Sequence, residues 1–249
     1  MKASALEFRF RILIHLVVIV LGFWAPWNAV LQLDRVRSVW LPAAVALERT
    51  GWLSLSGASN ALLGAGILFA LAGAWLRTWG TAYLSSAVVQ DGVMHGRAVV
   101  ADGPYRYVRN PLYLGTWLHM FALGLLMPPS GAVFTVVLIG VEQLRLIGGE
   151  EKFLSERLGE AYAAYQARVP RLVPSLRAQV PGSGARAAWG TAVLGEIYMW
   201  GVVVTFVVLG WRYNMELLAR GVQVSLGVAL VARAFLPRPA EAVAPSAEI

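Results

Sequence analysis

Long apolar runs separated by polar stretches dominate the pattern of this chain. A helix needs about 20 mostly apolar residues to cross about 30 Å of hydrocarbon, and four runs come close to this length. Two shorter runs, residues 112–127 and 131–147, are joined through the turn sequence PPSG, which predicts an antiparallel helical hairpin. The pattern therefore predicts an all-α, polytopic bundle of about six membrane-spanning helices, at residues 12–33, 59–76, 112–127, 131–147, 187–210 and 221–236.

Two long polar connections flank the predicted hairpin, residues 77–111 before it and about 148–186 after it. Within the second connection, apolar side chains recur at helical spacing over residues 150–169, which predicts an amphipathic helix ending near Pro170. Residues 34–57 mix charged and apolar side chains, which suits an interfacial connection or a short re-entrant helix. The predicted organisation is an N-terminal anchor and interfacial segment at 1–58, a core at 59–176, a C-terminal transmembrane hairpin at 177–236 and a disordered tail at 237–249.

Composition and charge support a membrane location. Of the 249 residues, 58% are hydrophobic and 14% are charged, and the mean hydropathy is +0.62, whereas soluble domains carry about 25% charged residues. Most of the 21 Lys and Arg fall on alternate connections, which is the distribution expected of cytoplasmic flanks. Both termini and both long connections are therefore predicted to be cytoplasmic. The N-terminal run lacks a small-residue cleavage site, so it is predicted to be a retained anchor in the plasma (inner) membrane.

The same composition excludes several functions. The net charge of +7 lies mainly in the predicted inner connections, where anionic lipid headgroups attract basic side chains, so nucleic-acid binding is not expected. The absence of cysteine excludes disulfides, thiolate metal sites and cysteine nucleophiles. The three histidines are too scattered along the chain to predict a metal site.

The stretch GPYRYVRNPLYLG, residues 103–115, concentrates tyrosine and arginine immediately before an apolar run. It enters the first arm of the predicted hairpin, and residues 145–165 leave the second arm, so both segments are expected at the same cytoplasmic rim. Irregular polar backbone is tolerated there when it lines a cavity. Such a pocket could accept a polar cofactor from water and an apolar partner from lipid. Each residue alone also fits a simpler role, as an interfacial aromatic anchor, a positive-inside arginine or a carboxylate near a helix start.

Three blocks of residues follow one another along the chain: Gly103-Pro104-Tyr105 with Arg109 to Gly115; Arg145 with Glu150, Glu151 and Leu154; and Gly159, Tyr162 and Tyr165 with Val169-Pro170-Arg171 and Pro174. Together, over roughly residues 60–176, they resemble the integral-membrane methyltransferases that include isoprenylcysteine carboxyl methyltransferase and the phospholipid N-methyltransferases. The resemblance implies a pocket for S-adenosylmethionine at the inner rim. By analogy with the family, its cofactor-binding residues would be Gln90, Arg97, Val99, Val100, Tyr105, Arg109, Asn110, Pro111, Leu112, Tyr113, Glu150 and Glu151.

The same resemblance implies three catalytic positions, Arg145, Glu150 and Asn110, with Arg145 holding the polar end of the acceptor. Family members usually carry histidine where Asn110 stands, and asparagine cannot titrate near neutral pH. Histidine is also common where Arg97 stands, and phenylalanine where Leu158 stands. The spacing between Arg145 and the glutamate pair is about one residue longer than in the family, so either glutamate could bind the cofactor.

The residue chemistry also suits methyl transfer without the resemblance. A sulfonium methyl is already activated, so the protein mainly has to align donor and acceptor, which can supply about 7–11 kcal/mol. A carboxylate such as Glu150 can hold an amino group, an arginine can pair with a carboxylate, and a tyrosine face can attract a sulfonium. A glycine-rich loop of the soluble type is not expected, because Gly64-Ala65-Gly66 lies inside a predicted membrane helix.

The predicted function is therefore a membrane enzyme that transfers a methyl group from S-adenosylmethionine to a lipophilic small-molecule or lipid acceptor. An arginine at the acceptor site favours a carboxylate resembling that of isoprenylcysteine, and a phospholipid amine is the alternative acceptor. A prediction of another class is a non-enzymatic small transporter or scaffold, whose rim residues serve as anchors and caps. Transporters place polar clusters near the middle of the membrane, whereas here they are predicted at its inner boundary.

Overall fold

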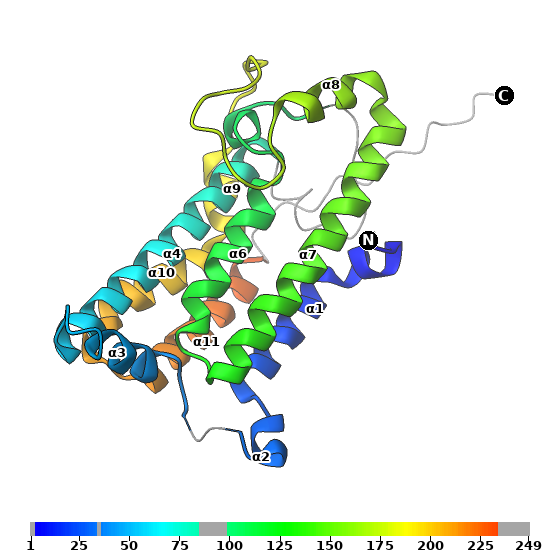
Figure 1. The fold of residues 1–249 in the computed structure, drawn as a ribbon. Helices are drawn as coiled ribbons and strands as arrows, with labels where there is room; N and C mark the ends of the chain where they lie inside the picture. Colours follow the sequence, from blue (N-terminus) through cyan, green and yellow to red (C-terminus); the bar gives the residue numbers. More distant parts are fainter. Residues whose placement is uncertain (1–2, 34–35, 85–98, 234–249) are drawn as a thin grey trace.

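The computed structural model describes residues 3–33, 36–84 and 99–233. This part of the chain is helical and contains no strand, which confirms the predicted all-α class for these residues. The two longest helices, α4 and α7, run along most of the bundle, and shorter helices pack beside them (Figure 1). The elements are α1 (Ala5–Trp24), α2 (Trp27–Leu31), α3 (Trp40–Glu48), α4 (Leu55–Leu84), η1 (Gly103–Arg106), α6 (Pro111–Gly124), α7 (Pro129–Leu158), α8 (Glu160–Arg168), α9 (Trp189–Gly195), α10 (Ile197–Leu209), η2 (Gly210–Arg212) and α11 (Met215–Ala232).

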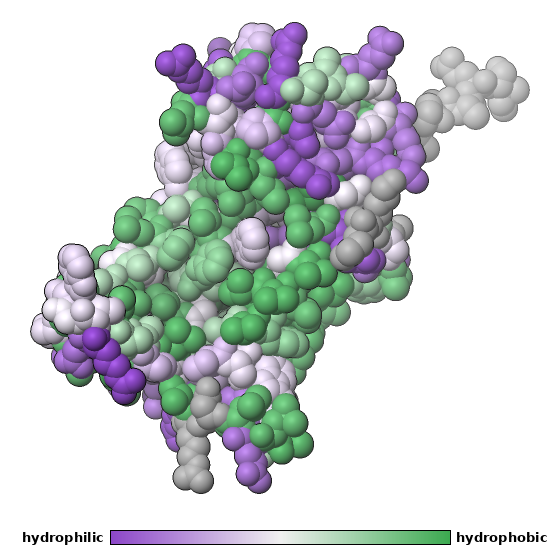
Figure 2. Space-filling model, viewed as in Figure 1, coloured by the Kyte–Doolittle hydropathy of each residue, from purple (hydrophilic) through white to green (hydrophobic). Residues whose placement is uncertain are grey.

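Three helices of the described residues, α4, α7 and α11, are long and apolar enough to cross a membrane. Helices α9 and α10 form a fourth candidate span that is bent by 68°. On the face shown in Figure 2, apolar side chains form a broad band, and hydrophilic side chains gather at the end that carries α8. The chain is therefore a helical membrane protein, and its described residues contain three or four candidate spans.

The prediction of about six spans is not confirmed. Helix α6 has 14 residues, which gives it a length of about 21 Å. Helix α1 carries three charged residues, Glu7, Arg9 and Arg11. It also ends at Trp24, earlier than the predicted span 12–33, because Ala25 adopts a left-handed conformation with a φ of 41° and a proline follows it.

The segments around these helices agree in part with the sequence patterns. Residues 125–128 form the short connection between α6 and α7, whereas Pro129, Ser130 and Gly131 of the PPSG sequence already belong to the first turn of α7. The short helix α3 lies within residues 34–57 and packs against α4. The tail predicted to be disordered, residues 237–249, lies outside the described residues. The division of the chain into four parts stays a prediction.

The single amphipathic helix predicted over residues 150–169 is wrong. Helix α7 continues to Leu158, and Gly159, with a φ of 53° that favours glycine, separates it from α8. Helix α8 then ends shortly before Pro170, as predicted. Glu150 consequently belongs to the same long helix as the apolar residues of α7, so the packing of that helix sets its position.

Helices α4 and α6 approach each other closely at two glycines. A Cβ added at Gly73 would lie 2.7 Å from the carbonyl oxygen of Gly115, and a Cβ added at Gly115 would lie 2.9 Å from the carbonyl oxygen of Gly73. Small residues at such crossings allow backbones to pack at short range. This crossing places Arg77 of α4 against the first turns of α6, where it donates to the hydroxyl of Thr116.

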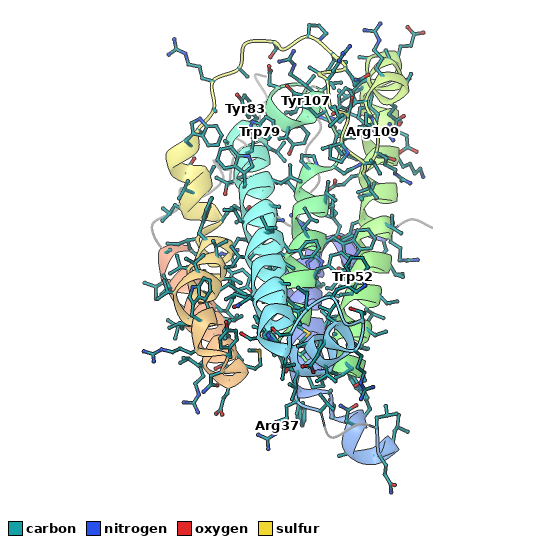
Figure 3. The ribbon with its side chains drawn as sticks, turned by 60° about the vertical axis from the view of Figure 1, so that its left-hand side comes forward. Arg37, Trp52, Trp79, Tyr83, Tyr107 and Arg109 are labelled. Carbon is teal, nitrogen blue, oxygen red and sulfur yellow. The ribbon has the colours of Figure 1, made fainter. Side chains whose placement is uncertain are left out.

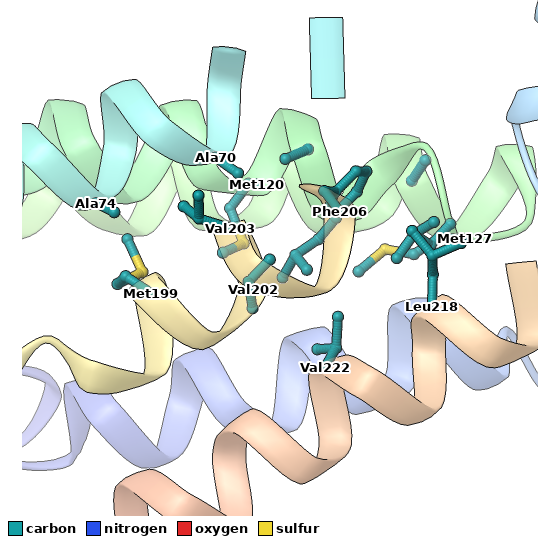
Figure 4. Close-up of a cluster of buried hydrophobic side chains, with 14 of the residues drawn as sticks. Ala70, Ala74, Met120, Met127, Met199, Val202, Val203, Phe206, Leu218 and Val222 are labelled. Carbon is teal, nitrogen blue, oxygen red and sulfur yellow. The ribbon is translucent and has the colours of Figure 1, made fainter. Parts of the chain in front are cut away.

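A cluster of buried hydrophobic side chains joins the C-terminal helices to the rest of the bundle (Figure 4). Phe206 of α10 is fully buried, and its ring would lie 2.6 Å from a Cβ added at Gly66 of α4. Leu218 of α11 is fully buried in the same cluster, which also contains Met120 of α6. The C-terminal hairpin is therefore packed into the bundle as part of one core.

The two ends of the bundle carry different side chains. Trp79, Tyr83, Tyr107 and Arg109 lie at one end, and Arg37 lies at the other (Figure 3). The rings of Trp79 and Tyr107 are 5.8 Å apart. We call the end with Arg109 the rim; it carries η1, α8 and the connection formed by residues 169–188.

Candidate active site

A cavity of about 260 Å³ lies at the rim, between α1, α6, α7 and α8. This volume is close to the lower end of the range for ligand pockets, about 300–1,000 Å³. The cavity is lined by Phe8, Arg11, Ile12, His15, Arg77, Leu84, Val99, Val100, Tyr105, Arg109, Asn110, Pro111, Leu112, Tyr113, Thr116, Glu150, Glu151, Phe153, Leu154, Leu158, Tyr162, Tyr165, Gly195 and Glu196.

The cavity brings together residues from both segments that the sequence singled out. Every described residue that was predicted to bind the cofactor lines it, whereas Gln90 and Arg97 lie outside the described residues. Two of the predicted catalytic positions, Asn110 and Glu150, are in the wall. The cofactor residues in the lining are Val99, Val100, Tyr105, Arg109, Asn110, Pro111, Leu112, Tyr113, Glu150 and Glu151.

Arg145, the residue predicted to hold the acceptor, does not line the cavity. Its guanidinium donates to both carboxylate oxygens of Glu7 on α1, at 2.9 and 3.0 Å. Arg145 and Glu150 are five positions apart, and at 3.6 residues per turn this turns the two side chains about 140° apart around α7. Arg145 therefore fastens α1 to α7 outside the cavity.

The stretch that precedes α6 is shaped by one glycine and two prolines. Gly103 has a φ of 55° and lies so close to the ring of Tyr83 that a Cβ would collide with it. The backbone N–H of Arg109 donates to the carbonyl of Pro170 at 2.8 Å, which links this stretch to the chain after α8. Pro111 begins α6 at a position where its missing N–H removes no helical hydrogen bond. The cavity wall is thus fixed at the start of α6.

Glu151 is held by three donors of the protein. Nε of Arg109 donates to Oε1 at 3.1 Å, Nδ2 of Asn110 donates to the same oxygen at 3.3 Å, and the guanidinium of Arg171 pairs with Oε2 at 2.9 Å. Arg109 also donates to two backbone carbonyls near the end of α8, at 2.7 and 2.8 Å. The side chains of Arg109 and Glu151 are 13% and 12% exposed, so separating them would leave a poorly solvated charge. Glu151 therefore ties α6, α7 and α8 together.

Glu150 has a different environment. The hydroxyl of Tyr113 donates to its Oε1 at 2.8 Å, and the carboxylate lines the cavity. Consecutive helical positions are turned by about 100°, so Glu150 points away from the group of donors around Glu151. Of the two glutamates, Glu150 is the one placed to meet a cationic group of a ligand.

Tyrosines form much of the remaining wall. The hydroxyl of Tyr105 is buried with no hydrogen-bond partner among the described residues, and the hydroxyl of Tyr165 donates to the carbonyl of Tyr105 at 2.8 Å. Burial raises the pKa of Tyr105 and of Tyr165, and it raises the pKa of Tyr162 to about 12, so all three phenols are neutral near pH 7. These residues can donate hydrogen bonds and present ring faces, but they are poor bases.

Two parts of the wall were not identified from the sequence. On α1, residues 8, 11, 12 and 15 line the cavity from one helical face, and the i, i+3, i+4, i+7 spacing is the signal that could have found them. From the C-terminal hairpin, Glu196 reaches the cavity and pairs with Arg77 at 2.7 Å. Glu196 is an ionisable residue inside an apolar run, and such residues generally pair with another polar group. Its position in the sequence is therefore the signal that could have indicated a partner.

Comparison with known families identifies the central part of the chain. A family model described as phospholipid methyltransferase matches residues 62–161. This domain belongs to that family of membrane methyltransferases. The methyltransferase domain contains Asn110, Tyr113, Glu150 and Glu151, whereas α1 and Glu196 lie outside it. Neither the curated proteins nor the solved structures give a match to this chain. The described residues contain no group of three or more His, Cys, Asp or Glu side chains that could hold a metal ion.

Proposed function

We propose that this protein transfers a methyl group from S-adenosylmethionine to a lipophilic acceptor at the membrane. The observation that carries the proposal is the shared cavity, in which Glu150 and the tyrosine rings stand together with the start of α6. The family of the domain at 62–161 supports the same chemistry. The distribution of Lys and Arg along the sequence favours a rim that faces the cytoplasm, where the cofactor is available.

The lining suits the parts of S-adenosylmethionine. Glu150 would bind its ammonium group through a charge-assisted hydrogen bond. The buried Tyr105 hydroxyl, which lacks a protein partner among the described residues, would bond a polar atom of the cofactor, and tyrosine faces would stabilise its sulfonium. Phe153 and Leu154 supply apolar surface for the adenine ring. When bound, the cofactor supplies an activated methyl group.

The wall formed by α1 offers a route for an acceptor. Ile12 lines the cavity, yet it is 45% exposed, so the cavity lies close to the outer surface of the bundle at this helix. Phe8 adds a second apolar side chain to the same wall. An apolar acceptor could therefore approach from lipid while its reactive end enters the polar cavity. The protein would contribute by holding donor and acceptor in line.

The proposal includes two acceptor classes. The argument for an anionic acceptor depended on Arg145, which does not line the cavity. The carboxylate of an isoprenylcysteine-like molecule and the amine of a phospholipid are therefore tested side by side. Membranes containing the protein are incubated with S-adenosylmethionine labelled in its methyl group, and the lipids are extracted. A base-labile methyl ester identifies a carboxylate acceptor, and a base-stable label identifies an amine.

Cofactor binding tests the proposal directly. Protein purified in detergent should bind S-adenosylhomocysteine with micromolar affinity or tighter by titration calorimetry. Glu150→Gln should weaken this binding about tenfold or more, because a charge-assisted hydrogen bond is lost. Glu156→Gln is the matched control on the same helix, since Glu156 is exposed and pairs with the exposed Lys152 one turn earlier. Undetectable binding by folded wild-type protein would reject the proposal, and cofactor-independent solute uptake in proteoliposomes would favour a transporter.

A further inference from the structure

The C-terminal hairpin contains a helix break that faces the cavity. Helices α9 and α10 are bent by 68°, and Glu196 between them has a φ of −106° and a ψ of 18°. Non-helical backbone at membrane depth is tolerated where it is buried in protein or lines a cavity. Gly195 and Glu196 both line the cavity, so the break is the point at which the hairpin reaches it.

Glu196 binds α4 through two residues. Nε and Nη2 of Arg77 donate to its two carboxylate oxygens at 2.7 and 2.8 Å, and the hydroxyl of Thr81 donates at 2.9 Å. The side chain of Glu196 is 5% exposed and that of Arg77 is 21% exposed. A buried two-point ion pair of this kind is costly to break, because removing one partner leaves the other charge uncompensated. The break is therefore fixed to α4 by charge as well as by packing.

Arg77 extends the connection to the start of α6. Its Nη1 donates to the hydroxyl of Thr116 at 2.8 Å and to the carbonyl of Leu112 at 3.4 Å. Leu112 lies in the first turn of α6, next to Tyr113, which bonds Glu150. Polar contacts thus run from the C-terminal hairpin to the first turn of α6, and the same turn carries Tyr113, the hydrogen-bond donor to Glu150.

We propose that Glu196 is a positioning residue for methyl transfer, and that the hairpin at residues 189–232 is part of the active unit although it lies outside residues 62–161. This inference rests on the proposed function. Glu196 acts through Arg77: its carboxylate holds the guanidinium in the wall, and the guanidinium holds the first turn of α6. Residues 62–161 alone therefore lack the Glu196 carboxylate, which holds Arg77 and the first turn of α6 in the cavity wall.

The test compares Glu196→Gln with two other variants. Glu196→Gln keeps the size of the side chain but leaves Arg77 without its anionic partner, and we expect the transfer rate per folded molecule to fall about tenfold or more. Affinity for S-adenosylhomocysteine should fall with it. Glu196→Asp keeps the negative charge, so it should retain more of the transfer rate and of the affinity for S-adenosylhomocysteine than Glu196→Gln. Glu216→Gln is the matched control, because it breaks an exposed ion pair with Arg220 in the same hairpin and should behave as wild type.

These measurements separate positioning from general stabilisation. A purely structural role for Glu196 would lower the melting temperature but leave the rate and the affinity of the folded molecules unchanged, and that result would overturn the inference. If Glu196→Gln does not fold, the double variant Arg77→Gln with Glu196→Gln carries no unpaired charge and takes its place. Wild-type transfer by that folded variant would overturn the inference as well. Absence of cofactor binding in the wild type would instead reject the proposed function.

Discussion

The hydroxyl of Tyr113 donates a 2.8 Å hydrogen bond to Oε1 of Glu150, and this bond joins the first turn of α6 to α7 at the cavity. The two residues are 37 positions apart, and the hairpin formed by α6 and α7 returns the chain to the same end of the bundle. The bond fixes the direction of the carboxylate before any ligand binds. A preoriented group loses little conformational freedom on binding, which favours affinity.

Tyr113→Phe should therefore weaken cofactor binding without unfolding the protein. The substitution keeps the ring and removes the hydroxyl that orients Glu150. We expect the affinity for S-adenosylhomocysteine to fall about three- to tenfold, within the range for one hydrogen bond to a charged group. Titration calorimetry measures this change. Tyr107→Phe is the control, because Tyr107 stands outside the cavity lining, and equal losses in the two variants would contradict the prediction.

The two adjacent glutamates should differ in what their loss affects. Glu151→Gln removes the carboxylate that holds Arg109, Asn110 and Arg171, so the free energy of unfolding should fall by roughly 2 kcal/mol. Glu150→Gln should change stability much less and cofactor affinity much more. Thermal unfolding and calorimetry on the same preparations distinguish the two effects. Loss of stability in Glu150→Gln with retained binding would reverse the assignment.

Local patterns in the sequence were sufficient to predict where the cavity lies. The short connection at residues 125–128 makes α6 and α7 antiparallel, so a motif before the first arm and a motif after the second must share one end of the bundle. That reasoning uses only connection length and the apolar pattern. It places residues 103–115 and the glutamate pair together without knowledge of any other helix.

Tertiary packing decided the features that the sequence did not predict. Arg145 and Glu150 share α7, but the helical turn between them points Arg145 at Glu7 of α1. Arg77 and Glu196 are 119 residues apart, and no periodicity relates them. Helix α7 also ends later than the predicted span 131–147. It continues past the apolar run and stops at Leu158, because Gly159 follows. Such features depend on which helices become neighbours.

The close crossing of α4 and α6 should be sensitive to one methyl group. In Gly115→Ala, the added Cβ would lie 2.9 Å from the carbonyl oxygen of Gly73 and 2.7 Å from Cγ of Arg77. The helices would have to separate, and we expect a loss of about 1–3 kcal/mol in the free energy of unfolding, together with weaker cofactor binding. Gly64→Ala is the control on α4, since its added Cβ would meet no atom within 4 Å beyond its chain neighbours and the adjacent backbone of its own helix. Equal stability of the two variants would refute the expectation.

Asp102 should make the rim sensitive to acid. The hydroxyl and the backbone N–H of Ser183 donate to its carboxylate, the N–H at 2.9 Å, and these bonds tie the connection after α8 to η1. Hydrogen bonds from Ser183 and from the backbone of residues 184 and 185 hold the pKa of Asp102 below its usual value, against the opposing effect of burial. A depressed pKa in the folded state means that the carboxylate stabilises the fold above the ordinary aspartate pKa, near 4, and that this stabilisation is lost as the pH falls through the lower folded value.

Asp102→Asn therefore should be less stable than the wild type at pH 7, and the difference should shrink as the pH falls below about 4. The asparagine amide can accept one hydrogen bond through its oxygen, but its nitrogen cannot accept the second. Thermal unfolding of both proteins between pH 3 and pH 7 measures the difference. Ser183→Ala removes the hydroxyl and keeps the N–H donor, so it should lose a smaller part of the same pH-dependent stability. A difference between wild type and Asp102→Asn that stays constant over this range would show that the carboxylate charge does not hold the connection.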